Sequence, residues 1–340
     1  MKKEEIKVSA ENGLDSIYVG DKFKGKQKKV IFDNIRRKLS KISHIPNIIV
    51  WQGPQVTVNY NLLNLRLANV AHYQTVPSMY EFCSKDQYHV YANHAANKLG
   101  GGAITKGFVQ EEKLTLTSSL IFPLTQKYLA GARYAILGTP LEQQPLLIKM
   151  NILLHENAQL FKEYYGSEGM EKINDNPAIL QKLYRRHRSE PRVYWLCKAI
   201  PMLHAGEDYS KMHQGYPVAV WAFYLALESY LLSIKCVEQD RNIDTIYIHD
   251  GNWGCGAFNH NINTIYLLEH LAINVAVQLA NPSKRVVFYY HTYNDEMMAK
   301  LKPAIAFWNQ LLAANSAVDE ALNILSDFHF NKIPEWSTKL

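Results

Sequence analysis

The order of apolar segments predicts an α/β fold, with long helices on both faces of a sheet of short strands. Short runs rich in Ile and Val alternate with apolar segments of helix length. Of the 340 residues, 47% are apolar and 20% are charged, which is enough to bury a large core. We expect one core domain over 46–340 with a helical insertion at 141–190, preceded by a basic N-terminal extension at 1–45.

The first half of the chain predicts short strands between helices. The N-terminal extension should end in a basic helix near 30–43. A further helix should begin after Glu112, and residues 141–190 are mostly helical by pattern, with a break over the polar stretch Gly166–Pro177. The expected strands of this half are Asn47–Trp51, Gln55–Tyr60, Tyr88–Ala92 and Arg133–Leu137.

The most apolar stretch of the second half, Pro217–Val237, predicts a helix that is apolar nearly all round and therefore buried. It is only marginally long enough to span a membrane, Glu228 interrupts it, and its proline stands at a first-turn position, so we expect a core helix and no membrane partner. The remaining expected elements are the strands Val193–Ile200, Thr245–His249 and Arg285–His291 and the helices Thr264–Ala280 and Asn294–Leu312.

The formal net charge of +6 is concentrated in two basic clusters. We interpret them as solvated surface. Attraction to a polyanion is the alternative. Neither cluster carries a nucleic-acid motif, so we do not expect a nucleic-acid partner. The clusters are Lys22, Lys24, Lys26, Lys28, Lys29, Arg36, Arg37, Lys38 and Lys41, and Arg185, Arg186, Arg188 and Arg192.

The cysteine pattern and the N-terminus predict a cytoplasmic protein. Four scattered cysteines lack paired spacing, which indicates neither a disulfide framework nor a metal site and favours a reducing compartment. The first residues lack the apolar core of a signal peptide. The Lys-, Asn- and Ile-rich composition is typical of an AT-rich bacterial genome, so delivery into a host cell without a classical signal peptide is an alternative.

The most informative run of the chain lies within residues 88–112. A strand-like segment ends in Asn97, three glycines follow at Gly100, Gly101 and Gly102, and Gln110 precedes the adjacent pair Glu111-Glu112. Bare backbone can approach a phosphate closely. Two adjacent carboxylates can divide acid–base work, because the charge of one disfavours the charge of the other. An acidic pair alone is commonly just a solvated helix start, but the combination predicts chemistry on a phosphate-bearing sugar.

A second candidate site is the loop from Asp250 to Phe258, between an expected strand and a long helix. In an α/β fold, ligands bind outside the carboxyl ends of the strands. Glycines at 251, 254 and 256 leave several backbone N–H groups able to face an anion. Two glycine loops at two strand ends can hold a pyrophosphate from both sides.

The two motifs together resemble those of the poly(ADP-ribose) glycohydrolases, which are built on a macrodomain. Three glycines, a short spacer and Gln-Glu-Glu are similar to the signature of that family, and residues 251–258 are similar to its diphosphate loop. Ala95-Ala96-Asn97 resembles the segment before the glycines in macrodomains. The resemblance covers roughly residues 75–310 and implies a three-layer α/β/α macrodomain-like fold with a mixed sheet.

The resemblance also implies a role for each matching residue. Glu112 would be the catalytic acid and would then deprotonate the attacking water. Glu111 would hold the ribose beside it, and Asn97 would orient the distal ribose. Gly100, Gly101 and Gly102 would cover one side of the diphosphate. The ligand-binding residues on the other side would be Gly251, Asn252, Trp253, Gly254, Cys255, Gly256, Ala257 and Phe258, with Gln110 beside the acidic pair. Neither a cofactor nor a metal is implied.

Two features depart from the family pattern. Asp250 stands where the family carries a small or hydroxyl residue. Either its side chain turns away and caps a turn, or it is a second catalytic acid near the distal ribose. No tyrosine-rich segment clearly matches the part of the family that stacks on adenine. The candidates for that role are Tyr164, Tyr165, Tyr289, Tyr290 and Tyr293.

Three functions follow from these motifs. The first is cleavage of ribose–ribose bonds in poly(ADP-ribose), and the second is removal of single ADP-ribose units from a modified protein, including arginine- or ubiquitin-linked units. The third is a non-catalytic ADP-ribose-binding module. The expected partners are an ADP-ribosylated protein or poly(ADP-ribose) as substrate and ADP-ribose as product. The acidic pair argues against the third function, and the change at Asp250 favours the second.

Overall fold

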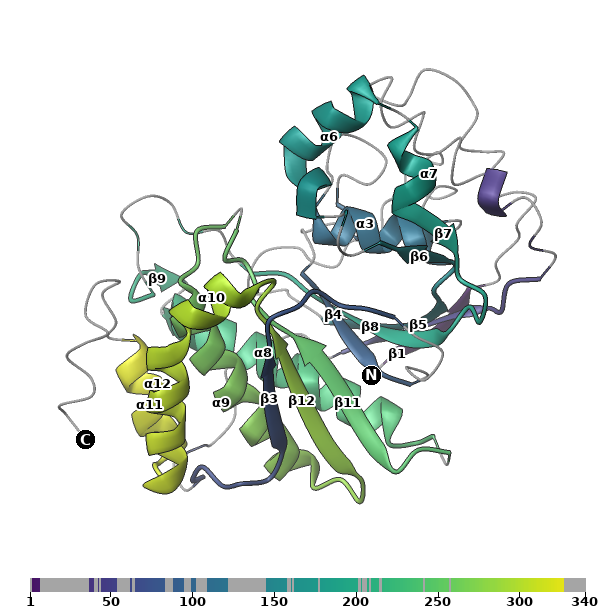
Figure 1. The fold of residues 1–340 in the computed structure, drawn as a ribbon. Coiled ribbons are helices and arrows are strands. Elements are labelled where there is room, and N and C mark those ends of the chain that lie inside the picture. The colour runs from purple at the N-terminus through teal and green to yellow at the C-terminus, as the bar shows by residue number, and fades with distance from the viewer. Residues whose placement is uncertain are drawn as a thin grey trace.

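The computed structural model describes residues 2–6, 37–39, 42, 44–53, 62, 65–82, 88–94, 99–101, 109–121, 145–157, 160, 162–176, 178–200, 203, 207, 209–213, 216–240, 242–256 and 258–326. Its centre is an eight-stranded sheet in the order β1-β2-β5-β8-β4-β11-β12-β3 (Figure 1). These strands are β1 (Lys2–Ile6), β2 (Ile48–Gln52), β3 (His72–Val76), β4 (Val90–His94), β5 (Leu146–Asn151), β8 (Arg192–Lys198), β11 (Thr245–Asp250) and β12 (Arg285–His291).

The sheet is mixed, as the resemblance implied. Strands β8, β4, β11, β12 and β3 are mutually parallel, whereas β5, β2 and β1 continue the sheet in antiparallel pairs. The register places His249 opposite Tyr91 on one side and opposite Tyr289 on the other. Because parallel strands run in the same direction, the carboxyl ends of β4, β11 and β12 lie at the same edge of the sheet.

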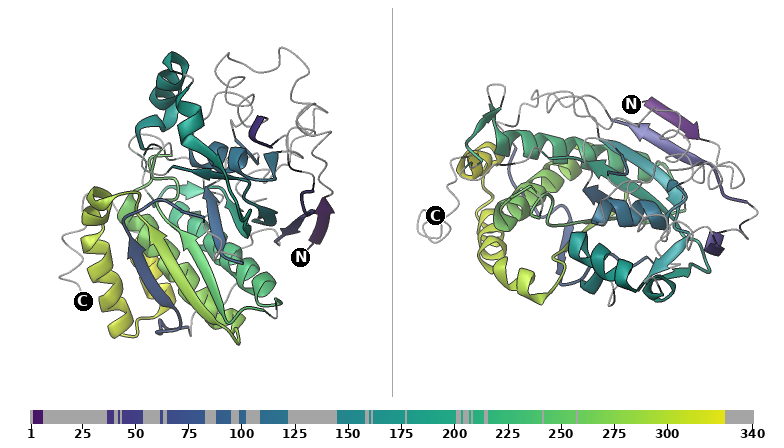
Figure 2. Two further views of the ribbon diagram at one scale, coloured as in Figure 1. Left: turned by 45° about the vertical axis from the view of Figure 1, so that its right-hand side comes forward. Right: turned by 90° about the horizontal axis from the view of Figure 1, so that it is seen from above.

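Helices cover both faces of the sheet, which confirms the predicted α/β/α layering (Figures 1 and 2). Successive strand residues alternate between two cores: Val90 and Leu196 face one, and Tyr91 and Trp195 face the other. The first face packs on α8 (Val218–Val237), α9 (Ile262–Ala280), α11 (Lys302–Ala313) and α12 (Val318–Ser326). The second face carries α3 (Gln110–Thr117), with α6 (Gly166–Asp175) and α7 (Ile179–Leu183) beyond it.

The two long central helices form as their sequences predict. Helix α8 is long and apolar enough to cross a membrane by length and composition, but 89% of its most apolar window is buried within the fold. Helix α9 begins at Asn261, whose side chain accepts hydrogen bonds from the backbone of Asn263 and Thr264. It ends at Asn281, which adopts a left-handed conformation. Both helices therefore serve as the buried layer under the parallel strands.

The expected domain organisation needs two corrections. Residues 2–6 form the edge strand β1, which pairs with β2, so the N-terminal extension contributes to the main sheet. Residues 146–151 form β5, an interior strand, so 141–190 is not helical throughout. Both faces of β5 are largely buried. The sequence pattern of such a short apolar run does not distinguish a strand from a helix. The expected break at 166–177 is the helix α6.

Several boundaries also differ from expectation. Strand β4 lies two residues later than expected, after Tyr88 at a φ of 74°. The helix expected over 294–312 is divided at Leu301 into α10 (Asp295–Lys300) and α11, which has a proline in its first turn. Strand β3 and helix α12 were not expected. The predicted strands 55–60 and 133–137 lie outside the described residues, and of the helix near 30–43 only 37–39 is described as helical.

The remaining described elements are small. They are the 3₁₀ turn η2 (Lys162–Tyr164) and two short antiparallel pairs, β6 (Leu154–Glu156) with β7 (Tyr184–Arg186), and β9 (Met212–His213) with β10 (Tyr216–Pro217).

Candidate functional site

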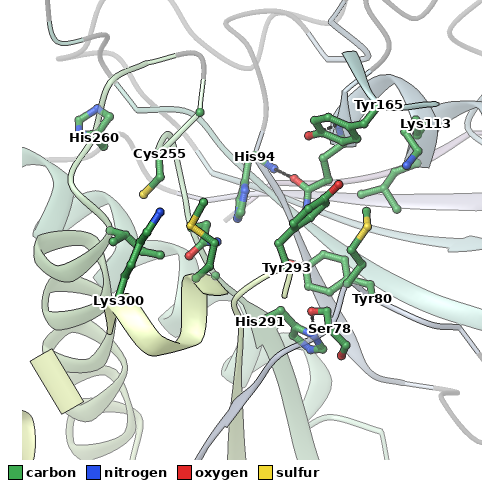
Figure 3. Close-up of a pocket in the computed structure, with 18 of the residues that line it drawn as sticks. Ser78, Tyr80, His94, Lys113, Tyr165, Cys255, His260, His291, Tyr293 and Lys300 are labelled. Atoms are coloured by element: carbon green, nitrogen blue, oxygen red, sulfur yellow. Dashed lines mark hydrogen bonds between the residues drawn. The ribbon is translucent and has the colours of Figure 1, made fainter. Parts of the chain in front are cut away.

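A cavity of about 640 Å³ lies where β4, β11 and β12 end (Figure 3). His94 ends β4, Gly251 follows β11 and His291 ends β12, and all three line the cavity. Its size is in the range that holds small molecules. The other lining residues are Ser78, Met79, Tyr80, Phe82, Gln110, Lys113, Leu114, Glu156, Tyr165, Asn252, Cys255, Gly256, His260, Asn261, Ile262, Tyr293, Met297 and Lys300.

The acidic pair lies in the first turn of α3, and it is not solvated. Glu111 is 3% exposed and Glu112 is 6% exposed. The Oε1 atom of Glu111 accepts a hydrogen bond from the backbone N–H of Gly100 at 2.8 Å. The Oε2 atom of Glu112 accepts one from the N–H of Val109 at 2.9 Å, so Glu112 caps its own helix. Both carboxylates are therefore held in fixed positions by backbone donors.

Gly101 explains why a glycine is needed beside the carboxylates. It has a φ of 47°, a left-handed conformation that favours glycine. A Cβ atom added there would lie 2.6 Å from Oε2 of Glu111 and 2.6 Å from Oε1 of Glu112. The two carboxylates thus converge on exposed, bare backbone. Gly100 is buried beside them, and Gly102 lies outside the described residues.

The amide side chains of β4 and α3 hold this arrangement together. Asn93, which is fully buried, donates from Nδ2 to Oε1 of Glu111 at 3.5 Å. The Oε1 atom of Gln110 accepts the backbone N–H of His94 at 3.2 Å, and its Nε2 donates to the carbonyl of Ala92 at 3.5 Å. Gln110 therefore ties the start of α3 to the end of β4. The predicted Asn97 lies outside the described residues, and among the described residues Asn93 contacts Glu111 of the acidic pair.

The loop after β11 passes close to the end of β12. Gly251 has a φ of 146°, and an added Cβ atom would lie 2.1 Å from the carbonyl oxygen of His291. The side chain of Asn252 is used within the fold, because its Nδ2 donates to the carbonyl of Thr292 and its Oδ1 accepts from the hydroxyl of Tyr290. Of this loop, Gly251, Asn252, Cys255 and Gly256 line the cavity.

The other loop residues turn away from the cavity. Trp253 is buried, and Phe258 packs against the main core. An added Cβ atom at Gly254 would lie 2.6 Å from Ile200.

Cys255 lines the cavity. Burial raises the pKa of its thiol well above the ordinary value, so this residue is a neutral part of the cavity wall. Ala257 lies outside the described residues.

Asp250 is fully buried and does not line the cavity. Its Oδ2 atom lies 2.6 Å from Nζ of Lys198, and the hydroxyl of Tyr230 donates to the same oxygen at 2.8 Å. Its Oδ1 atom accepts the N–H of Gly251 and lies 3.0 Å from Nε2 of His94. Asp250 thus turns inward and caps the turn, the first of the two alternatives for this residue.

A second carboxylate completes this buried cluster. Lys198 also contacts Glu269 of α9 and lies 4.1 Å from the ring centre of Trp253. Burial would raise the pKa of Asp250, but Lys198 and His94 hold it well below its usual range. Burial and the charge of Asp250 raise the pKa of Glu269 well above its usual range. A neutral Glu269 leaves one cation and one anion, which balances the buried charge.

Two of the five candidate tyrosines meet at the cavity. Tyr165 and Tyr293 both line it, and their ring centres are 6.0 Å apart. The hydroxyl of Tyr165 accepts the backbone N–H of Gln110 at 3.1 Å, which connects this aromatic wall to α3. By contrast, Tyr164 packs in a separate core, Tyr290 is buried, and Tyr289 does not line the cavity.

Two lysines line the cavity on opposite sides in the view of Figure 3. Lys300 is exposed on α10 and pairs with Glu296. Lys113 is buried, with its Nζ 3.8 Å from Oε2 of Glu156. Burial lowers the pKa of Lys113 to about 8, although Glu156 opposes that shift. The cavity therefore has a lysine on two sides, each of them beside a carboxylate.

Comparison with known proteins gives similarity in structure alone. The sequence matches no protein-family model and no curated protein. Two solved structures of poly(ADP-ribose) glycohydrolase from Deinococcus radiodurans, both in complex with ADP-ribose, are similar to this chain. The structure of a single-substitution mutant has 15% identity and a TM-score of 0.42. The other has 13% identity and a TM-score of 0.40. Each alignment covers 87% of this chain and 98% of the other.

Sequence reasoning missed several residues of the cavity. His94 and Lys113 stand beside the recognised motifs, and each directly adjoins a strand end or the acidic pair. Their position next to these motifs is the sequence feature that could have identified them as cavity residues. Tyr80, His260 and Lys300 had no local signal, since they come from segments distant in sequence that meet only in the folded chain.

Proposed function

We propose that this protein is an ADP-ribosyl glycohydrolase that acts on protein-linked mono- or poly-ADP-ribose. One observation carries the proposal: the carboxylates of Glu111 and Glu112 converge on the bare backbone of Gly101, at the helix whose next residue, Lys113, lines the cavity. This arrangement can present a proton donor to a sugar that approaches over the glycine. The proposed ligand, ADP-ribose, follows from the resemblance of both motifs to those of the poly(ADP-ribose) glycohydrolases.

The reaction would break the bond between the anomeric carbon of the distal ribose and the acceptor atom joined to it, which is an oxygen in every linkage of the panel except the arginine one. Such a bond cleaves through an oxocarbenium-like state, so the leaving oxygen must receive a proton. Glu112 donates that proton. Water then adds to the anomeric carbon and releases a proton, and Glu112 is reprotonated before the next turnover. Glu111, fixed by Gly100 and Asn93, holds the ribose hydroxyls beside Glu112.

The cavity wall accommodates the rest of the ligand. The backbone from Gly251 to Gly256 borders the cavity where β11 ends, which suits a diphosphate. Lys300 lies on that side and would offset part of its charge. Tyr165 and Tyr293 offer ring faces for the adenine.

A substrate panel separates the three functions. Wild-type protein is incubated with radiolabelled poly(ADP-ribose) and with proteins that carry serine-, arginine-, glutamate- or ubiquitin-linked single units, and the released ADP-ribose is measured. Release from the polymer identifies a polymer hydrolase, and release only from single units identifies a mono-ADP-ribosyl hydrolase. Binding of ADP-ribose in calorimetry without release from any substrate contradicts the enzyme proposal and leaves a binding module.

A further inference from the structure

A histidine that the glycohydrolase motifs do not include lies at the cavity wall. His94 is the last residue of β4, and its side chain, 18% exposed, lines the cavity. In the view of Figure 3 its ring lies between Cys255 and Tyr293. Its backbone N–H donates to the side chain of Gln110, which fixes His94 next to the first turn of α3. A titratable ring thus lines the cavity and is tied through its backbone to Gln110, the residue before the acidic pair.

The buried cluster determines which nitrogen of His94 carries the proton. Nε2 lies 3.0 Å from Oδ1 of Asp250. Asp250 is paired with Lys198 and remains ionised, and an ionised carboxylate only accepts hydrogen bonds. Nε2 therefore bears the hydrogen, and Nδ1 keeps its lone pair. Within the described part of the chain, no group donates a hydrogen bond to Nδ1.

We propose that His94 is the base that removes a proton from the attacking water, with Asp250 as the positioning residue behind it. The inference rests on the proposed function. As the bond to the leaving oxygen breaks, Glu112 supplies the proton to that oxygen. The water forms its bond to the anomeric carbon and gives one proton to Nδ1 of His94. That proton passes to solvent, and Glu112 is reprotonated from solvent, so each turnover consumes one water and no net proton.

The pairing of a buried carboxylate with an imidazole favours this role over simple packing. In hydrolases of the Ser-His-Asp type, the carboxylate holds the ring in one tautomer and stabilises the cation that forms. The fully buried His270 of α9 shows the structural alternative, because it is stacked on Tyr266 and bonded to the carbonyl of that residue. His94 instead faces the cavity and is backed by an ion pair.

Burial keeps the His94 ring neutral at neutral pH. Burial lowers the pKa of His94, Asp250 of β11 opposes this shift, and Lys198 of β8 adds to it. A neutral ring can accept a proton, so the activity should fall on the acid side as His94 becomes protonated. The other titratable groups that face the same cavity are Tyr80, Lys113, Glu156, Tyr165, Cys255, His260, His291, Tyr293 and Lys300.

The test measures kcat and KM between pH 4 and pH 9 for wild type, His94→Gln and His94→Ala, with the exposed His44→Gln as a matched control. We expect His94→Gln to lower kcat by about 10²- to 10⁴-fold with KM changed by less than about threefold. Added imidazole should restore turnover to His94→Ala in proportion to the unprotonated imidazole. His44→Gln should match wild type.

Asp250→Asn gives an independent readout. Because the carboxylate raises the pKa of His94, its removal should move the acid limb of the pH profile to lower pH. Glu269 still contacts Lys198 in this variant, and loss of the Asp250 charge removes one cause of its raised pKa, so Glu269 can supply the anion in its place. Full activity of His94→Gln, or no rescue of a folded His94→Ala by imidazole, overturns the role of His94 while the glycohydrolase proposal stands. An inactive wild type overturns the proposed function itself.

Discussion

At the scale of single residues, Gly101 connects the backbone to the chemistry. Residues with a side chain rarely adopt its backbone conformation. A Cβ atom added there would lie 2.6 Å from an oxygen of each of the two carboxylates. A glycine here therefore serves two requirements at once. It permits the turn, and it leaves room for the carboxylates of Glu111 and Glu112, which are almost fully buried.

The variant Gly101→Ala should show whether the carboxylates need the space at Gly101 for turnover, apart from the backbone strain that any side chain causes there. The added methyl group would displace both carboxylates, and we expect kcat to fall by about 10²-fold, as a small misplacement of reacting groups does. The matched control is Gly166→Ala, since Gly166 has a φ of 72° and an added Cβ atom there meets nothing within 4 Å. Both variants should lose stability by about 1–3 kcal/mol, but only Gly101→Ala should lose turnover. Equal turnover of the two variants would refute the account of Gly101.

The residues found from the sequence and those missed differ in one physical respect. Glu111, Glu112 and the glycines stand close together along the chain, so their pattern is visible locally. His94 meets Asp250 across a separation of 156 residues, and the register of β4 on β11 brings them together. No local pattern contains that register. The inward turn of Asp250 likewise depends on Lys198 of a third strand.

At the scale of elements, the buried cluster joins β8, β11 and α9 under the loop that follows β11. Lys198 is fully buried between Asp250 and Glu269. Asp250 directly precedes Gly251 and accepts its N–H, so the ion pair also fixes where the loop begins. The loop backbone thus takes its position from charges in the core.

Lys198→Met should destabilise the fold strongly. It would leave the Asp250 carboxylate buried without its cation, which typically costs about 3–5 kcal/mol in the free energy of unfolding. Urea denaturation measures that loss. Lys211→Met is the control, because Lys211 pairs with Glu207 at the surface, and its change should stay below about 1 kcal/mol. A loss below about 1 kcal/mol for Lys198→Met would mean that the buried pair is dispensable.

The edge strand β1 gives a second element-scale prediction. Lys3 and Glu4 of β1 lie opposite Trp51 and Val50 of β2. In an antiparallel pair of strands, one of two successive residues donates its backbone N–H to the neighbouring strand. The double change Lys3→Pro and Glu4→Pro removes that donor. We expect a thermal unfolding midpoint at least about 2 °C below that of the matched double threonine variant. Identical midpoints would show that residues 2–6 add nothing to the sheet.

At the scale of the whole molecule, the sequence predicted the layers better than the sheet order. Strong helices such as α8 and α9 and the strand β12 were expected close to their observed bounds. The mixed sheet followed only from the family resemblance. The strand nature of 146–151 was missed because burial on both faces removes the alternation that marks a strand. The strand β3 was missed because it is short, is only partly buried and has just two apolar residues, Tyr73 and Val76.

The same scale explains why one cavity collects groups from so many segments. Parallel strands end at one edge, so residues after β4, β11 and β12 meet there whatever their separation in sequence. The acidic pair reaches this edge because Gln110 ties α3 to the end of β4. The fold thus brings Gln110, at the start of α3, and the loop after β11 to one cavity.

The most direct test of the central claim compares the rate of ADP-ribose release by wild type, Glu112→Gln and Glu171→Gln on the best substrate of the panel. Glu171 is exposed on α6 and serves as the matched control. We predict that Glu112→Gln lowers kcat by about 10²- to 10⁴-fold while still binding ADP-ribose, and that Glu171→Gln equals wild type. A Glu112→Gln variant as active as wild type would contradict the assignment of Glu112 as the acid.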